Sequence, residues 1–357
     1  MRRNAASRAV LGLACLLAWH GACAAQPRRT GAASQRFPPD AQSRGMGDAF
    51  TALAEGPSAV WWNPAALATG PELAVAPFGY SKLLPKSSAD LTIYSFSAAG
   101  RRRALGAGFN LNYLNYGEGD LIVGSSAFHE TTMHLGGGVD ILRLLAPAEE
   151  RFRLSAGTSL KRMTDNDPAE LLSGGGDASA TAWDMDLGVL GSVRLPFGAA
   201  TDSLRPCAFV ARAGSVWVNA LDSELRHDLQ AVPVGQSVRS GLALGVDLFD
   251  KPTYGYVLRL RAASDLTTAS GRANSGSDVT NFGAEATLFE LVSVRTGYVD
   301  DPDHELKDPT FGVGFGRDFP DALGLRTFGF QFDWAQLPQP EGFEDHHHFS
   351  LSAHGTF

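Results

Sequence analysis

Apolar and polar residues alternate along most of the chain from residue 72 to residue 357. In one clear segment, Trp183 and Leu187 are apolar, while Asp184 and Asp186 lie between apolar neighbours. An alternation with a period of two places the apolar side chains on one face of a β-strand and the polar side chains on the other. The pattern recurs in segments of about ten residues and predicts about fourteen strands, each long enough to cross an outer membrane when tilted.

Connections of two kinds alternate between the predicted strands. Short joins lie at 99–102, 249–253 and 289–291, and long polar segments lie at 165–179, 219–236 and 300–309. Outer-membrane barrels combine short periplasmic turns with longer extracellular loops. The sequence therefore predicts an all-β protein, a transmembrane antiparallel β-barrel formed by residues 72–357. A soluble periplasmic β-sandwich or propeller is the alternative, because it would also alternate.

The segment 25–71, ahead of the strands, has a different pattern. Some of its apolar residues repeat at the spacing of one helix face: Met46, Ala49, Phe50 and Leu53. Proline is tolerated in the first turn of a helix and glycine permits sharp exits, so Pro57, Pro64 and nearby glycines divide this stretch into short helical pieces. Helical pieces ahead of an all-β run predict a hatch that plugs the barrel lumen.

Three short motifs lie in this stretch: Arg44-Gly45-Met46-Gly47-Asp48-Ala49-Phe50, Ser58-Ala59-Val60 and Asn63-Pro64-Ala65. Together they resemble the N-terminal hatch of the outer-membrane barrel family that includes the FadL long-chain fatty-acid transporters and the PorV-type proteins. The resemblance covers residues 43–68, and the rest of the chain matches the family in architecture only.

The resemblance implies two functions of different kinds. The FadL branch implies passive outer-membrane transport of hydrophobic small molecules, fatty-acid-like or hydrocarbon-like, past the hatch. The PorV branch implies a docking platform that receives exported proteins. For transport, the residues expected to line or gate the route are Phe50, Leu53, Val60, Trp61, Trp62, Asn63, Pro64 and Ala65. An equally supported interpretation is that Trp61 and Trp62 anchor the hatch to the barrel wall.

The polar face of the strands is expected to line the lumen. Glycines recur there and either leave room for the hatch or let the sheet bend, for example at Gly106, Gly108, Gly136, Gly138, Gly241 and Gly245. Charged residues on the same face are expected to form pairs that brace the wall. Asp184 and Asp186 would lie between a strand that carries Arg153 and Lys161 and a strand that carries Arg212.

One charge pair also predicts a register. If Phe289-Glu290-Leu291 forms a tight turn, Glu285 lies opposite Arg295, within reach of an ion pair. A shift of one residue would send both charges into the bilayer, which favours this register. A pore for anions or polar substrates is the alternative role for the lumen charges, although residues of both signs are mixed along it.

The two ends of the chain carry signals for export and assembly. A secretory signal peptide is predicted at 1–24 from Arg2, Arg3 and Arg8, an apolar run at 9–19 and the small residues Ala22-Cys23-Ala24. A lipoprotein anchor at Cys23 is the alternative. The last strand alternates up to Phe357 and resembles the signal that barrel-insertion machinery reads.

Composition and missing motifs exclude other classes of protein. The net charge of −8 argues against a nucleic-acid partner. The sequence has no G-x-S-x-G elbow, phosphate loop or dinucleotide fingerprint, so no enzyme activity and no cofactor are expected. The histidine run 346–348 and the acidic residues at 300–308 are expected to be solvated rather than to bind a metal. Once the signal peptide is removed, Cys207 is the one cysteine left, and no disulfide can form within a chain.

Overall fold

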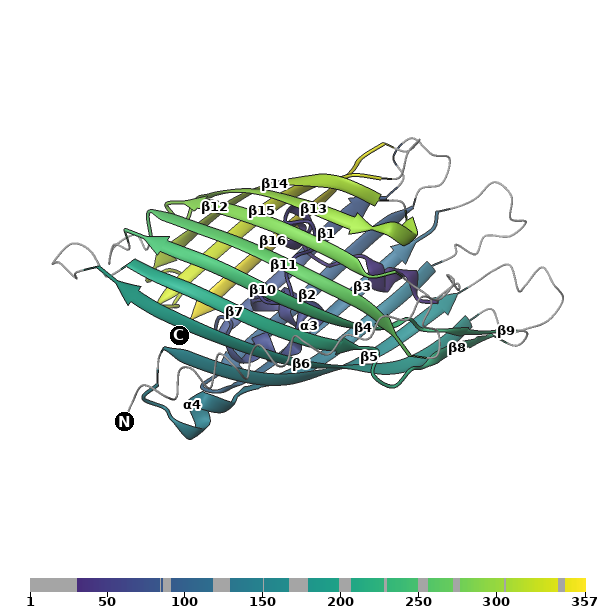
Figure 1. The fold of residues 1–357 in the computed structure, drawn as a ribbon, viewed down its shortest axis with the longest axis horizontal. Helices are drawn as coiled ribbons and strands as arrows, with labels where there is room; N and C mark the ends of the chain where they lie inside the picture. Colours follow the sequence, from purple (N-terminus) through teal and green to yellow (C-terminus); the bar gives the residue numbers. More distant parts are fainter. Residues whose placement is uncertain are drawn as a thin grey trace.

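The computed structural model is a closed β-barrel with a segment folded inside it (Figure 1). It describes residues 31–83, 85, 91–117, 129–149, 151–166, 179–198, 207–227, 230–249, 256–271, 277–304, 306–339 and 344–357. The expected signal peptide at 1–24 lies outside the described residues.

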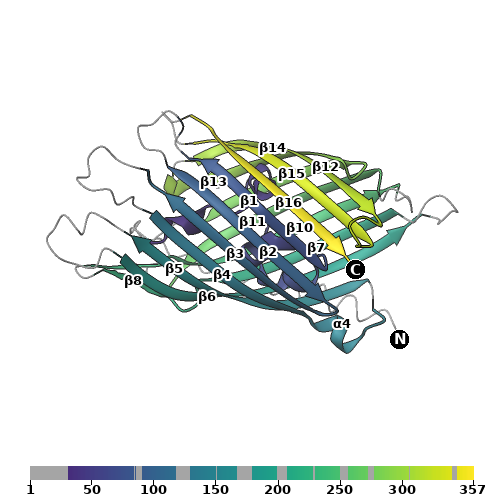
Figure 2. The same cartoon turned by 180° about the vertical axis from the view of Figure 1, so that it is seen from behind.

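Fourteen antiparallel strands form the barrel, and β1 closes it by pairing with β16 (Figures 1 and 2). The barrel strands are β1 (Leu73–Lys82), β2 (Thr92–Arg102), β3 (Leu105–Asn115), β4 (His129–Asp140), β5 (Phe152–Asn166), β6 (Ser179–Phe197), β7 (Cys207–Val218), β10 (Gln236–Leu248), β11 (Leu258–Ser270), β12 (Val279–Leu288), β13 (Val292–Asp301), β14 (Leu306–Pro320), β15 (Thr327–Leu337) and β16 (His346–Thr356). A separate hairpin of β8 (Glu224–His227) and β9 (Gln230–Pro233) lies in the connection between β7 and β10. The predicted all-β barrel is confirmed, and its closure leaves no unpaired strand edge in lipid.

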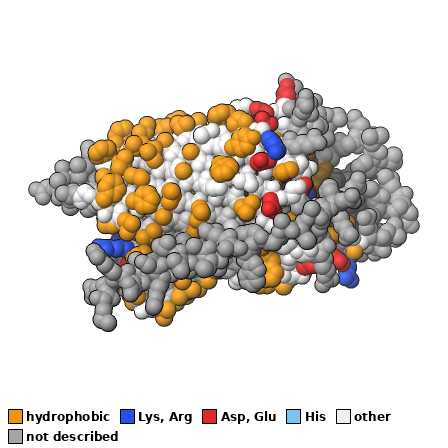
Figure 3. Space-filling view, in the orientation of Figure 1, with side chains coloured by type: hydrophobic (Ala, Val, Ile, Leu, Met, Phe, Trp, Pro, Cys, Tyr) orange, Lys and Arg blue, Asp and Glu red, His pale blue; other side chains and the backbone are white. Residues whose placement is uncertain are grey.

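The outer wall of the barrel is apolar and the inner wall is mostly polar. In β6, the Trp183 side chain is 54% exposed, whereas the adjacent Asp184 is completely buried. Apolar side chains cover much of the outer wall in Figure 3, and charged side chains lie mainly towards its two ends. A band of exposed apolar side chains of this extent needs an apolar solvent, so the strands span a membrane.

The two ends of the barrel differ in their connections. Phe289 and Glu290 join β12 to β13 in a tight turn, with φ of 54° and 53°. The C-terminus lies at the same end (Figure 1), which is the periplasmic end by the rule for outer-membrane barrels. At the opposite, extracellular end, the connection expected at 300–309 is shorter than predicted. Strands β13 and β14 stay paired as far as Asp301 and Leu306, so both strands extend into that segment.

The segment 31–71 forms the hatch in the lumen. Its helical pieces are η1 (Ala33–Arg36), α2 (Ala41–Gly45), η2 (Gly56–Ser58), α3 (Ala59–Trp62) and η3 (Pro64–Ala68); α4 (Ile141–Leu145) and η4 (Pro302–His304) lie in connections of the barrel. No helix among the described residues is long and apolar enough to cross a membrane. The prediction of a helix face at residues 46–53 is wrong, because these residues form turns. Gly47 and Asp48 have φ of 62° and 63°, which an α-helix does not allow.

Glycines on the wall strands allow the hatch to lie directly against the barrel backbone. A Cβ atom at Gly157 would lie 2.5 Å from the Ala65 nitrogen and 2.5 Å from the Pro64 oxygen. No side chain fits at such a position, so the hatch occupies the space that the side chain would need. Gly245 is different, because the nearest atoms to its Cβ position belong to the wall, at 3.4 Å or more.

Candidate functional site

The hatch has a hydrophobic core that contains six of the eight residues expected along the ligand route: Phe50, Leu53, Val60, Trp61, Trp62 and Ala65. They pack against Leu190, Ala243 and Ala263 of the wall. The Trp62 ring lies 5.9 Å from the Phe50 ring and 4.6 Å from the Trp61 ring, in edge-on contacts. The structure therefore brings these residues together at the centre of the lumen.

Asn63 and Pro64 form the turn that joins the hatch to the wall. The Asn63 side-chain amide donates to the Val189 oxygen of β6 at 3.1 Å and to the Thr51 oxygen at 3.3 Å. Its Oδ1 accepts from the Ala65 nitrogen at 3.2 Å and caps η3. Pro64 suits the first position of that helix, because it has no N–H group that needs a partner there.

Asp265 of β11 holds the hatch from another side of the barrel. Its Oδ2 accepts from the Phe50 nitrogen at 3.0 Å and from the Thr51 nitrogen at 2.8 Å. Sequence reasoning missed this residue. The available signal was a carboxylate at an inward position of a predicted strand, but nothing in the sequence indicates which backbone groups it contacts.

A cavity of about 340 Å³ lies on the extracellular side of the hatch, and we call it the extracellular vestibule. Trp61 and Trp62 of the hatch line it, together with Arg239 of β10. The Arg239 guanidinium lies 4.5 Å and 5.0 Å from the two ring centroids and donates to the Trp61 oxygen at 3.2 Å. Cation–π contacts of this kind hold the rings in place. Sequence reasoning also missed Arg239.

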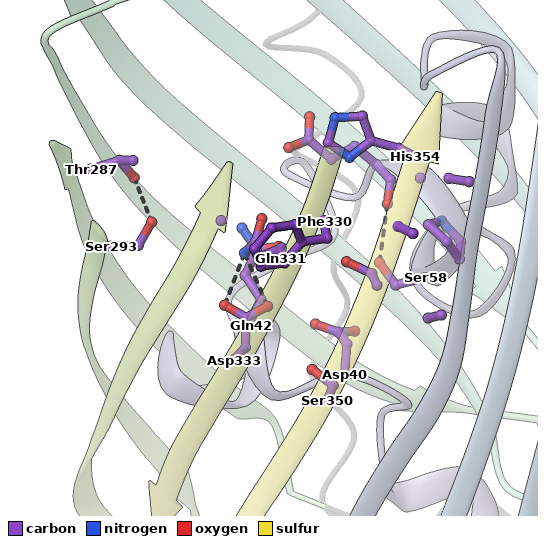
Figure 4. A pocket seen from close by; sticks show the side chains of 18 of the residues that line it. Asp40, Gln42, Ser58, Thr287, Ser293, Phe330, Gln331, Asp333, Ser350 and His354 are labelled. Carbon is purple, nitrogen blue, oxygen red and sulfur yellow. Dashed lines mark hydrogen bonds between the residues drawn. The ribbon is translucent and has the colours of Figure 1, made fainter. Parts of the chain in front are cut away.

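Two further cavities, of about 320 Å³ and 310 Å³, lie on the periplasmic side of the hatch. Polar side chains point into the first of them, including Asp40 and Gln42 from the hatch and Gln331 and Asp333 from β15 (Figure 4). Within the described part of the chain, no residue lines both the extracellular vestibule and either periplasmic cavity. The hatch therefore separates the two halves of the lumen.

Glu285 lies directly opposite Arg295 in the ladder of β12 and β13, as the tight turn predicts. Arg295 Nε donates to Glu285 at 2.6 Å, and Arg295 Nη1 donates to Asp333 at 2.6 Å. Gln42 of the hatch donates to the same carboxylate, Glu285, at 3.3 Å. The wall network therefore reaches the hatch, and Asp333 is a member that sequence reasoning did not find.

Asp186 pairs with one of the side chains expected for it, and Asp184 does not. Asp186 pairs with Lys161 at 2.7 Å, and both side chains are buried. Asp184 instead accepts from the backbone nitrogens of Leu221 at 2.9 Å and Ser223 at 3.1 Å. Asp184 thus holds the connection that follows β7 rather than a neighbouring strand.

The expected pairing of Arg153 and Arg212 with these two aspartates is wrong. Both arginines lie opposite Ser192 in the strand ladders, six residues along β6 from Asp186. Six residues of a strand span about 20 Å, too far for an ion pair. Arg153 contacts Asp140 at 3.4 Å instead, and Arg212 contacts Glu55 of the hatch at 3.8 Å.

The second periplasmic cavity is rich in arginine, and we call it the arginine basin. Its charged lining consists of Arg151, Arg153, Arg194, Arg212, Arg259 and Arg261 with the carboxylates Glu55 and Asp247. Burial raises the pKa of Glu55, but the positive charges of Arg261 and Arg212 outweigh burial and hold that pKa below its usual value. Glu55 is therefore ionised at neutral pH.

The histidine run does not form the solvated cluster that was expected. His346 and His348 are buried on the inner face of β16, whereas His347 lies on the outer face, with its ring 5.6 Å from that of Trp334. The alternation of strand side chains separates them in this way. The described residues contain no group of three potential metal ligands.

Comparison with known proteins gives matches in structure only. No family model and no curated protein sequence matches the chain. The Ralstonia pickettii toluene transporter TbuX matches with a TM-score of 0.48 and 12% identity, over 90% of this chain and 98% of that chain. A Pseudomonas aeruginosa FadL homologue matches with a TM-score of 0.49 and 11% identity, over 94% and 100%. The chain is similar to FadL-family barrels. The Pseudomonas putida toluene transporter TodX matches with a TM-score of 0.42 and 12% identity, over 93% and 98%.

These FadL-like matches do not assign a ligand, because their sequence identities are 11–12% and their TM-scores lie below 0.5. The fold of the chain rests on its own strand pairing. The similarity to the PorV branch stays a prediction.

Proposed function

We propose that the protein passes small hydrophobic molecules across the outer membrane, with the hatch as its gate. The observation that carries this proposal is the position of Trp61 and Trp62. They line the extracellular vestibule from the hatch side, where the hatch closes the lumen. In the closed hatch, Trp61 is 6% exposed and Trp62 is 2% exposed, so their rings become apolar contact area for a ligand from outside when the hatch shifts.

The chemistry of the vestibule narrows the class of ligand. Its volume of about 340 Å³ lies at the lower end of the range for small-molecule pockets, about 300–1,000 Å³. Arg239 places a positive charge on the tryptophan rings, which disfavours a cationic ligand. Charged residues line the periplasmic cavities, so a molecule with both an apolar body and a polar group suits the route better than a pure hydrocarbon.

A docking platform for exported proteins is the second candidate function. The observation that favours it is the closed lumen. The hatch backbone lies against wall glycines such as Gly157, and Asn63 and Asp265 hold it there. A barrel whose hatch never moves would conduct nothing and would serve only as a scaffold.

Uptake by bacterial cells that lack their own FadL-type barrel tests the proposal. We expect cells that express the protein to take up labelled octanoate faster than cells that do not. Trp61→Ala should reduce the added rate by about fivefold or more, because it removes an aromatic contact from the vestibule. Trp334→Ala is the matched control, since Trp334 stacks on His347 at the outer wall.

Two results would contradict the proposal, one against transport itself and one against the route through the vestibule. One is an uptake rate that does not rise when the wild-type protein is expressed, which would favour the platform. The other is equal uptake through the Trp61→Ala and Trp334→Ala variants, which would remove the vestibule from the route. Heat-modifiable migration in electrophoresis shows for each variant that the barrel is folded.

A further inference from the structure

The arginine basin contains more positive than negative side chains. Its lining has six arginines and two carboxylates. Asp140 and Glu285 also contact arginines of the basin, which gives four carboxylates in all. Positive charges still exceed negative ones, and the walls of a barrel concentrate such a field within the lumen. The basin has a volume of about 310 Å³, enough for a small anion.

Four of the basin arginines contact wall carboxylates, and one of them, Arg261, contacts Glu285 at 3.6 Å. Asp247 pairs with Arg194 at 2.8 Å and with Arg259 at 2.7 Å. Asp140 pairs with Arg153 at 3.4 Å. These contacts join one part of the wall to another, and the hatch takes no part in them.

Arg212 and Arg261 hold a side chain of the hatch. Glu55 lies 3.8 Å from Arg212 and 3.4 Å from Arg261, much longer than the 2.6 Å between Glu285 and Arg295. The Glu55 side chain is 40% exposed and lines both periplasmic cavities. Ion pairs of a partly exposed side chain are weak, so an anion from solution can compete with Glu55 for these arginines.

The wall leaves room for such an anion. Arg212 belongs to β7 and Arg261 to β11, and β10 lies between them. Gly245 of β10 lies opposite Arg261 in the ladder. It has no side chain to fill the gap, and the nearest atoms to its Cβ position are wall atoms at 3.4 Å or more. This explains a glycine on the inner face that the hatch does not touch.

We propose that the arginine basin is a binding site for a carboxylate or phosphate group, and that Glu55 of the hatch occupies it when no external anion is bound. Guanidinium groups bind carboxylates and phosphates through paired N–H···O bonds. An anion between Arg212 and Arg261 displaces Glu55 and removes one attachment of the hatch to the wall. The site faces the periplasmic side, so the proposal does not depend on transport from outside.

Calorimetric titration of the folded protein in a neutral detergent tests the site. The probes are sodium phosphate, sodium hexanoate and hexan-1-ol, at constant ionic strength. We expect saturable binding of at least one anion, weakened by Arg212→Gln, whereas any binding of the alcohol, which the extracellular vestibule can accept, should be equal in the wild-type protein and in Arg212→Gln. Binding of hexanoate alone assigns the site to the carboxylate of an amphipathic molecule, whereas binding of phosphate alone assigns it to a free or lipid-borne phosphate group.

Two variants should shift the affinity in opposite directions. Glu55→Gln removes the internal competitor and should tighten anion binding by about fivefold. Arg212→Gln removes a ligand of the anion and should weaken binding by about tenfold or more. Arg162→Gln is the matched control, because Arg162 lies on the outer wall over the Trp183 ring.

The proposal is overturned if Glu55→Gln binds the anions no more tightly than the wild-type protein does. It is also overturned if neither protein binds an anion, or if Arg212→Gln leaves the binding of every anion unchanged. Heat-modifiable migration, measured before each titration, shows that every variant is folded.

Discussion

Replacing Gly157 with alanine should displace the asparagine–proline turn of the hatch and leave the barrel closed. The new Cβ would lie 2.5 Å from the Ala65 nitrogen and the Pro64 oxygen, whereas ordinary contacts begin at 3.4 Å. These are backbone atoms that cannot rotate away, so the turn has to retreat by about 1 Å. Overpacking of this kind costs about 1–3 kcal/mol. Loss of the bond from Asn63 to the Val189 oxygen adds about 1 kcal/mol.

A destabilisation of at least 2 kcal/mol should make local opening of the hatch about 30 times more frequent or more. Hydrogen exchange of residues 59–68, followed by mass spectrometry, measures that opening. Gly245→Ala is the matched control, because its Cβ would meet only wall atoms, at ordinary distances. Equal exchange in the two variants, with both barrels heat-modifiable, would refute the conclusion that the hatch is seated on Gly157.

Two further predictions concern charge and pH. Glu285→Gln leaves the fully buried Arg295 without one of its two carboxylates and should lower the unfolding free energy by about 3–5 kcal/mol. Arg153→Gln removes a partly exposed side chain that contacts Asp140 at 3.4 Å, and it should lower the unfolding free energy by less than about 1 kcal/mol. The temperature of heat-modifiable unfolding measures both, and equal losses would contradict the assignment. Burial raises the pKa of Asp40 from 3.8 to about 6. Between these two pH values the folded hatch keeps a proton on Asp40 that the unfolded chain releases. The free energy of unfolding of the hatch should therefore fall by about 3 kcal/mol as the pH rises from about 4 to above 6. Hydrogen exchange of α2, corrected for its intrinsic pH dependence, should show this fall in the wild-type protein; the same fall in Asp40→Asn would count against it.

The barrel was predictable from the sequence because lipid imposes a strict rule on it. Each strand has to present apolar side chains to the bilayer, so the alternation gives the strands and their faces. The Glu285–Arg295 register followed from a tight turn and from the penalty for placing charges in lipid. No comparable rule relates strands joined by long connections. The sequence therefore does not predict how far such strands are shifted along each other. In the structure, Arg153 and Arg212 both lie opposite Ser192, too far from Asp186 for an ion pair.

The hatch was predictable only in part. Its prolines and glycines indicated short helical pieces, and the structure has them. Its turns at Gly47 and Asp48 depend on contact with the wall backbone, which leaves no periodic signal in the sequence. The same is true of Asp265 and Arg239, whose partners are backbone groups and aromatic rings of the hatch.

A disulfide between the hatch and the wall tests the gate most directly. A Cβ at Gly108 would lie 3.4 Å from the Val60 Cβ, close to the separation of about 3.5–4.5 Å in disulfides. Val60→Cys with Gly108→Cys, in a Cys207→Ser background, should therefore oxidise to a hatch fixed to β3. The gate predicts that oxidised cells take up octanoate at the rate of cells without the protein and that reduction restores uptake, with Val60→Cys alone insensitive to both treatments. The gate would be contradicted if cells with the double-cysteine variant took up octanoate faster than cells without the protein, and at the same rate in the oxidised and reduced states.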